Sequence, residues 1–158
     1  MTTPTQNVQV YRVFIKAPVQ AVWDAITNGK MTEQYGYRCA DEFDLRPGGT
    51  YRSMANAEMQ ASGMPEVAVS GEVIEVDAPN RLVQTWNAGW NADGPTVLTW
   101  ELAERPNGVT EVTVTHDLTG APETATMVAG EVENAGGGWA MVLSDMKTLL
   151  ETGAAMGG

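Results

Sequence analysis

The only histidine of the chain, His116, is the side chain best suited by type to move a proton near neutral pH, because the ordinary pKa of imidazole lies close to that pH. It ends a run of alternating residues, in which Val112, Val114 and His116 share one side and polar residues occupy the other. Such alternation is typical of a strand with one dry face. We therefore expect His116 to face the interior. Three roles are open to it there. It is buried with structural hydrogen-bond partners, it contacts a ligand, or it acts as a general acid or base.

Aromatic and polar side chains share this predicted inner face. In residues 81–87 Trp86 alternates in phase with Gln84, and in residues 96–103 Trp100 falls between two inward leucines. Large apolar side chains with a few polar groups among them are typical of a cavity for a small molecule. The residues predicted to line such a cavity from the strands, besides His116, are Tyr51, Gln84, Trp86 and Trp100.

Three other groups of residues could in principle react or bind an ion, but their sequence context favours structural roles. Cys39 has no titratable base beside it in sequence, which favours a structural thiol over a nucleophile. The acidic run at residues 41–44 alternates around Phe43 and is interpreted as a solvated strand edge. Arg46 precedes a Pro-Gly-Gly turn that joins two strands rather than opening a helix, so a phosphate-binding loop is rejected.

Bulk composition narrows the class of protein. The chain has 158 residues, which favours a single domain over residues 1–158, and a net charge of −11, which argues against nucleic acid and anionic membrane surfaces. The first ten residues lack a secretory pattern, and no apolar run is long enough to span a membrane. One cysteine and one histidine make neither an internal disulfide nor an ordinary zinc site, so we expect a cytoplasmic protein without a metal or other cofactor.

The elements that must position these side chains follow from periodicity and turn residues. Residues 8–15 predict a strand, residues 17–29 a helix with an apolar face, and residues 30–35 a second short helix. Further strands are expected from the same pattern, with a Pro47–Gly48 turn between the first two: residues 39–45, 50–56, 67–76, 81–87, 96–103 and 108–118. Residues 58–66 are predicted to form a flexible loop, and residues 119–134 a lid-like loop with a helical turn.

The last helix is predicted over residues 136–151, with Asn134 as its N-cap and Gly153 as its stop. One arc of its surface is apolar, and the opposite side, which includes Asp145, is polar. The apolar arc consists of Trp139, Val142, Leu143, Met146, Leu149 and Leu150. Of these, Trp139, Leu143 and Met146 are predicted to contact a ligand. The three glycines before this arc let the backbone pass close to a neighbour.

The element order predicts an α+β fold, in which a curved antiparallel sheet of about six or seven strands closes around the last helix. The motifs "APVQAVWDAIT", "DLRPGG", "GEVIEVDAPNRLVQTW", "TVLTWEL", "TEVTVTH" and "GGGWAMVLSDMKTLLE" occur in the order found in the helix-grip superfamily of START-like and birch-pollen-allergen-like proteins. The chain most resembles the bacterial branch related to the C-terminal domain of the activator of heat-shock protein 90 ATPase. It departs from that pattern at "QYGYRC", where a tryptophan is common, and at Gln84, where an apolar residue is usual.

The resemblance implies a hydrophobic cavity between the sheet and the last helix, and no universal catalytic residue. The leading interpretation is therefore a monomer or homodimer that binds a small hydrophobic or aromatic molecule in that cavity. One alternative is a cyclase-like or hydrolase-like enzyme that uses His116 as its acid or base. Another is a chaperone-associated interaction module. Fold alone does not decide between them.

Overall fold

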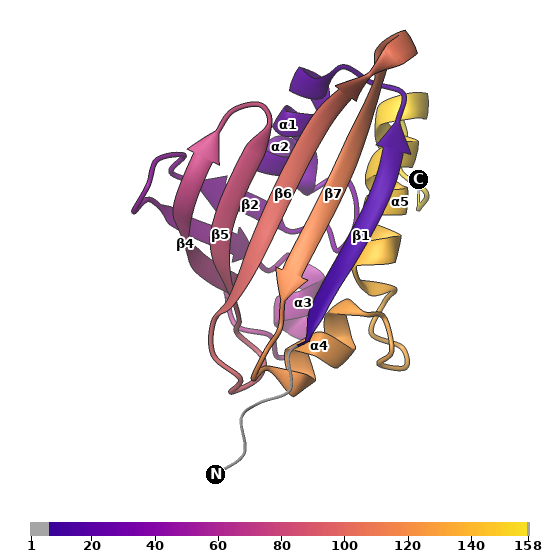
Figure 1. Ribbon diagram of the computed structural model, residues 1–158. Coiled ribbons are helices and arrows are strands. Elements are labelled where there is room, and N and C mark those ends of the chain that lie inside the picture. Colours follow the sequence, from indigo (N-terminus) through magenta and orange to yellow (C-terminus); the bar gives the residue numbers. More distant parts are fainter. Residues whose placement is uncertain (1–6, 158) are drawn as a thin grey trace.

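A seven-stranded antiparallel sheet forms the body of the protein in the computed structural model, which describes residues 7–157 (Figure 1). The strands are β1 (Val8–Ile15), β2 (Ala40–Phe43), β3 (Thr50–Met54), β4 (Val67–Asp77), β5 (Arg81–Ala88), β6 (Thr96–Arg105) and β7 (Val109–Asp117). The helices are α1 (Val19–Thr27), α2 (Gly29–Thr32), α3 (Ala57–Ala61), α4 (Pro122–Val128) and α5 (Gly138–Thr152), with a 3₁₀ turn at Pro106–Gly108. The predicted α+β helix-grip architecture is confirmed.

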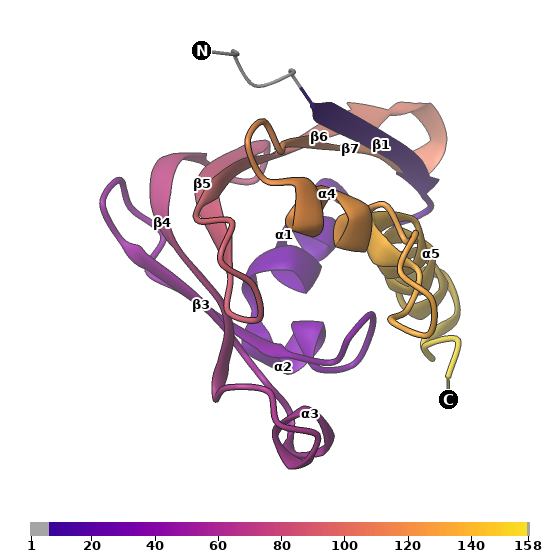
Figure 2. The ribbon, with the colours of Figure 1, turned by 90° about the horizontal axis from the view of Figure 1, so that it is seen from below.

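The sheet has the order β1-β7-β6-β5-β4-β3-β2, so chain-neighbouring strands from β2 to β7 pair as hairpins and β1 closes the far edge against β7. It bends into an arc whose concave side encloses α1, α4 and α5 (Figure 2). Register shifts after Ser53 and Val73 mark bulges, which increase local twist. Gly71 lies beside this bend, and a Cβ there would stand 2.0 Å from the Thr85 carbonyl oxygen. The backbones of β4 and β5 therefore approach closely at Gly71.

Inner and outer strand faces follow the predicted alternation. Leu98, Trp100 and Leu102 of β6 are buried, as are the inward residues of β5 and β7. The apolar face of α1 is also buried, including Val22 and Trp23, and it packs against the concave side of the sheet. The core therefore lies between the arc of strands and the helices.

The last helix differs from its prediction at two residues. Asn134 does not cap it, because α5 begins at Gly138 with Gly137 as the N-cap residue. Asp145 is not on a solvated side but is 4 % exposed. Its carboxylate accepts hydrogen bonds from the backbone amides of Gly36, at 2.8 Å, and Met156, at 2.7 Å. Leu143 and Met146 are buried as predicted, and Gly153 ends the helix with a φ of 87°.

Two connecting segments carry more structure than their sequences predicted. Residues 58–66 were expected to form a flexible loop, but α3 occupies their first part, with the Asn56 side chain accepting a hydrogen bond from the Met59 amide. A polar five-residue helix has no periodicity from which to predict it, so only the cap residue signalled it. The segment between β7 and α5 contains α4 rather than a single helical turn. No helix in residues 7–157 is long and apolar enough to cross a membrane.

Gly138 is the glycine on which the entrance to α5 depends, and Gly138→Ala should cost about 2 kcal/mol or more of unfolding free energy. Its φ is +65°, and a Cβ there would stand 2.1 Å from the Val128 carbonyl oxygen. Gly153→Ala is the matched control, because Gly153 also has positive φ but open space around it. That control should cost only about 1 kcal/mol. Equal losses in urea unfolding would show that close packing against α4 is not the reason for glycine at position 138.

Candidate functional site

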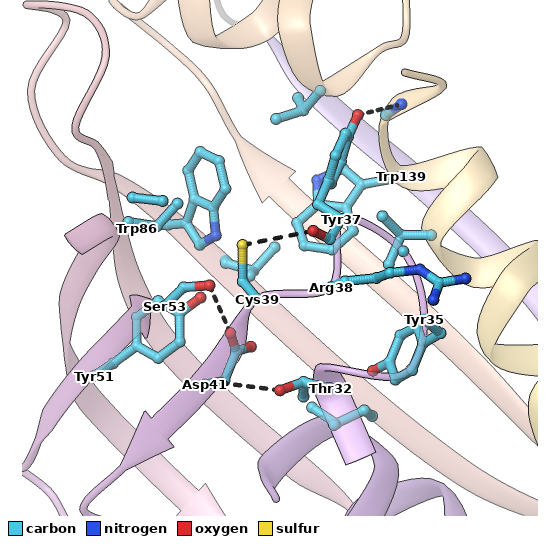
Figure 3. Close-up of a pocket in the computed structure, with 18 of the residues that line it drawn as sticks. Thr32, Tyr35, Tyr37, Arg38, Cys39, Asp41, Tyr51, Ser53, Trp86 and Trp139 are labelled. Carbon is cyan, nitrogen blue, oxygen red and sulfur yellow. Dashed lines mark hydrogen bonds between the residues drawn. The ribbon is translucent and has the colours of Figure 1, made fainter. Parts of the chain in front are cut away.

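A cavity of about 160 Å³ lies inside the concave face of the sheet (Figure 3). Side chains from strands β2 to β6 line it, together with residues of α4, α5 and the segment between α2 and β2. Single residues of α1, α2 and α3 complete the lining. This is the space that the sequence predicted between the sheet and the last helix.

Four tryptophans form most of the aromatic wall. Trp100 and Trp139 meet edge to face with ring centroids 5.6 Å apart, and Trp86 packs at 5.9 Å against the half-exposed Trp90. Trp86 also lies 6.3 Å from Trp139, so the rings make one continuous surface. Such edge-to-face pairs hold each other in fixed orientations. The wall is therefore pre-formed for a flat apolar molecule.

Polar groups line the cavity at the hairpin of β2 and β3 and at Gln84 of β5. Asp41 stands directly across from Ser53 in the strand register, and the Ser53 hydroxyl donates a 2.6 Å hydrogen bond to its carboxylate. The Asp41 backbone amide donates to the Thr32 hydroxyl at 2.9 Å, which ties β2 to α2. Gln84 is 1 % exposed, and its amide makes only a 3.4 Å contact with the neighbouring Thr85 carbonyl. A ligand in the cavity would therefore meet polar groups on this wall.

The interpretation of residues 41–44 as a solvated edge is wrong for Asp41. Its side chain lines the cavity, and burial raises the pKa of its carboxyl to about 7, against a smaller opposing effect of the Ser53 hydrogen bond. Burial and the Asp41 charge also raise the pKa of Tyr51 well above its usual value. The hairpin register was the signal for Asp41, because a strand partner of the inward Ser53 must itself point inward.

His116 is buried and does not line the cavity. Trp139 Nε1 donates to His116 Nδ1 at 3.0 Å, and His116 Nε2 lies 2.7 Å from the Thr96 hydroxyl. That hydroxyl donates to the Trp86 carbonyl oxygen, so it accepts from His116 and the network assigns the proton to Nε2. Burial lowers the His116 pKa to about 4. Both ring nitrogens are occupied by structural partners, which leaves none free to exchange a proton with a substrate.

The structure brings five of the eight predicted site residues to the cavity. These five are Tyr51, Gln84, Trp86, Trp100 and Trp139. His116, Leu143 and Met146 are not among the lining residues, because they pack one layer deeper, where each is at most 3 % exposed. His116 supports the cavity through its hydrogen bond to Trp139 instead.

The segment between α2 and β2 is held in place by contacts to α5 and to the loop before it. Asp145 of α5 binds the Gly36 amide, as described above. The Tyr37 hydroxyl accepts from the Gly138 amide at 3.0 Å (Figure 3) and donates to the Ala135 carbonyl at 3.2 Å. These bonds fix a wall that sequence analysis did not assign to the site, and Tyr37 carries the contact because Gly136 leaves room for its ring.

Cys39 lies on the same wall, where its thiol is 3.6 Å from the Met59 sulfur. Burial raises the pKa of the thiol, which opposes formation of the nucleophilic thiolate. The structural role predicted for Cys39 agrees with this environment. No group of three or more potential metal-ligating side chains of His, Cys, Asp or Glu occurs within residues 7–157.

The curved antiparallel sheet closed around a C-terminal helix defines the chain as a helix-grip protein of the SRPBCC superfamily. Residues 16–151 match the Activator of Hsp90 ATPase homolog 1-like protein family, and the chain belongs to that family. No curated protein matches the sequence.

Solved structures share this fold at low sequence identity. CalU16 from Micromonospora echinospora has a TM-score of 0.68 at 20% identity, over 94% of this chain and 78% of that chain. NE0264 from Nitrosomonas europaea has a TM-score of 0.67 at 19% identity, over 92% of this chain and 95% of that one. PFC0360w, an HSP90 activator from Plasmodium falciparum, has a TM-score of 0.56 at 20% identity, over 95% of this chain and 91% of that one. Likenesses at this level of identity establish the fold alone.

Proposed function

We propose that this protein binds a small hydrophobic molecule with an aromatic ring in the cavity between α5 and the sheet. The observation that carries the proposal is a cavity of about 160 Å³ whose wall is built from tryptophan rings. Binding would be driven by burial of apolar surface, at about 25 cal/mol per Å². Membership of a superfamily that typically binds hydrophobic ligands supports it.

The volume of the cavity limits the size of the ligand. An apolar cavity of about 150 Å³ in another protein accepts benzene, whereas sites for drug-sized molecules measure about 300–1,000 Å³. A space of about 160 Å³ therefore suits one aromatic ring with a short substituent. A lipid or a fused polyketide would require the wall to move.

An enzymatic role through His116 has no geometric support. The imidazole lies outside the cavity lining, and its two nitrogens are bonded to Trp139 and Thr96. A chaperone-associated role rests on the family name and stays an alternative prediction. The ligand-binding proposal accounts for the pre-formed cavity, which neither alternative uses.

Filling the cavity should abolish binding without loss of the fold. Ala68 lines the cavity and is 3 % exposed, so Ala68→Leu places extra carbon atoms in the ligand's space. We expect toluene and indole to raise the melting temperature of the unaltered protein, and their affinity to fall about tenfold or more in Ala68→Leu. The shift is measured by differential scanning fluorimetry, and the affinity by quenching of tryptophan emission.

Ala103→Leu provides the matched control, because Ala103 lies on β6 outside the cavity lining. It should bind both probes like the unaltered protein. If no apolar probe raises the melting temperature of the unaltered protein, or if Ala68→Leu binds as well as Ala103→Leu, the proposed function is wrong.

A further inference from the structure

Asp41 is a carboxylate without a counter-ion inside an aromatic cavity. Within residues 7–157, no lysine, arginine or histidine forms an ion pair with it, and its one side-chain hydrogen bond is the one from Ser53 to Oδ1. Arg38 also lines the cavity, but its guanidinium points toward α5 and away from Asp41 (Figure 3). Removing a carboxylate from water without pairing its charge is costly. The Oδ2 atom is thus available to a donor that enters the cavity.

The surroundings of Asp41 favour a cation over other donors. Aromatic faces attract ammonium groups, and Tyr51 of β3 and Trp86 of β5 line the same cavity as the carboxylate (Figure 3). The net charge of −11 attracts cations and repels anions at long range. Gln84, with its amide almost unpartnered, adds a hydrogen-bond acceptor to the same space.

Resting on the proposed function, we infer that the ligand is an amine: a molecule with one aromatic ring and a short arm that ends in a protonated amino group. The ring occupies the space beside Trp100 and Trp139, and the ammonium group binds Asp41. The size of the cavity, about 160 Å³, allows one ring and an arm of one or two atoms. Benzylamine is the simplest molecule of this class.

Asp41 is expected to change charge near neutral pH, because its pKa lies at about 7. Its titratable neighbours are Tyr35 and Cys39 on the segment before β2, and Tyr51 on β3, and the pKa of each is raised by burial. All three therefore stay neutral near pH 7. The negative charge of Asp145 on α5 also raises the Tyr35 pKa. Amine affinity should rise with pH from about 5 to about 8, across the Asp41 pKa of about 7. Neutral ligands should show no such rise.

The experiment compares benzylamine, toluene, benzyl alcohol and benzoate by isothermal titration calorimetry. In the unaltered protein at about pH 8, above the Asp41 pKa of about 7, benzylamine should bind about 10- to 100-fold more tightly than toluene. Benzoate should not bind measurably. Asp41→Asn keeps the side-chain shape and an acceptor for Ser53, and it should remove this advantage while leaving toluene binding within about threefold.

Glu42→Gln is the matched control for charge. It removes one negative charge from the adjacent, exposed position of β2 and should leave benzylamine affinity unchanged. A pH series on the unaltered protein tests the charge even if Asp41→Asn does not fold, because benzylamine affinity should rise across the Asp41 pKa of about 7 while toluene affinity stays constant.

Each outcome has a distinct meaning. If toluene or benzyl alcohol binds but benzylamine gains nothing from Asp41, the amine inference is overturned and the proposed function stands. A benzylamine affinity in the unaltered protein that does not rise across the Asp41 pKa of about 7 overturns it equally. If none of the four probes binds, the proposed function fails as well.

Discussion

Asp41→Asn should raise the free energy of unfolding at pH values above the Asp41 pKa of about 7, by up to about 4 kcal/mol. The carboxyl pKa is raised in the folded state from its model-peptide value of 3.8. Between these two values the folded protein holds a proton that the unfolded chain has released, so stability falls as pH rises. Above pH 7 the full cost of the buried charge is present, and asparagine removes it.

The measurement is urea unfolding of both proteins at about pH 8, above the 3.8-to-7 window, and at about pH 4, close to its lower end. At the lower pH Asp41 is neutral in the folded protein and only partly ionised in the unfolded chain, so the two free energies should differ by less than about 1 kcal/mol. Thr32 and Ser53 keep their hydrogen bonds to position 41 in the variant, which limits other effects. If Asp41→Asn is less stable than the unaltered protein at pH 8, then Asp41 stabilises the fold and its charge is compensated.

A gain of this kind would mark Asp41 as a residue kept for function at a cost in stability. Where activity needs a strained or destabilised residue, replacing that residue raises stability and lowers function. Unpaired charges in apolar surroundings belong to that class. The stability result and the amine-binding result would then have one cause, namely the missing counter-ion of Asp41.

Sequence patterns predicted the fold and three of the four tryptophans of the aromatic wall. Strand alternation places Trp86 and Trp100 inside, and helical periodicity places Trp139 there. Trp90 lies in the connection between β5 and β6, where no period applies. Strand alternation also placed His116 correctly in the interior. Its partners were not predictable, because Thr96 and Trp139 reach it only through the packing of α5 on the sheet.

Two of the residues that sequence analysis misplaced are acidic. Asp145 was assigned to solvent from its helical phase, yet its partners are backbone amides at Gly36 and Met156, which no side-chain pattern reveals. Asp41 was assigned to solvent from its acidic neighbours, although Glu42 and Asp44 point the other way. In both cases charge was taken to mean exposure. Asp145 is buried because it binds backbone amides that are distant in sequence. Asp41 faces the cavity because its strand partner Ser53 does.

His116→Ala should lower the free energy of unfolding by about 3–5 kcal/mol near pH 7, because it empties a fully buried site and leaves the Trp139 Nε1 donor without a partner. A double-mutant cycle with Trp139→Phe isolates their hydrogen bond. The pair should show a coupling of about 1–2 kcal/mol, since the second substitution removes the stranded donor. Additive losses would show that the two side chains merely pack together.

The cost of His116→Ala should shrink on acidification. Since the His116 pKa falls from 6.5 to about 4 on folding, the unfolded chain binds more protons between those values, and stability decreases by about 3 kcal/mol as pH falls through them. Alanine removes this dependence. A loss that stays the same at about pH 7 and about pH 4 would contradict the neutral, Trp139-bonded imidazole.

Asp41 and His116 have opposite slopes over nearly the same pH range, so the unaltered protein should show a flat profile from about pH 4 to about pH 6.5. Asp41→Asn should then expose a stability that rises with pH, owing to His116. His116→Ala should expose one that falls with pH, owing to Asp41. Each variant therefore shows the pH dependence of the residue that it retains. Slopes of the opposite sign would disprove both pKa assignments. If the unfolding free energy of both variants is independent of pH, neither pKa is shifted by folding.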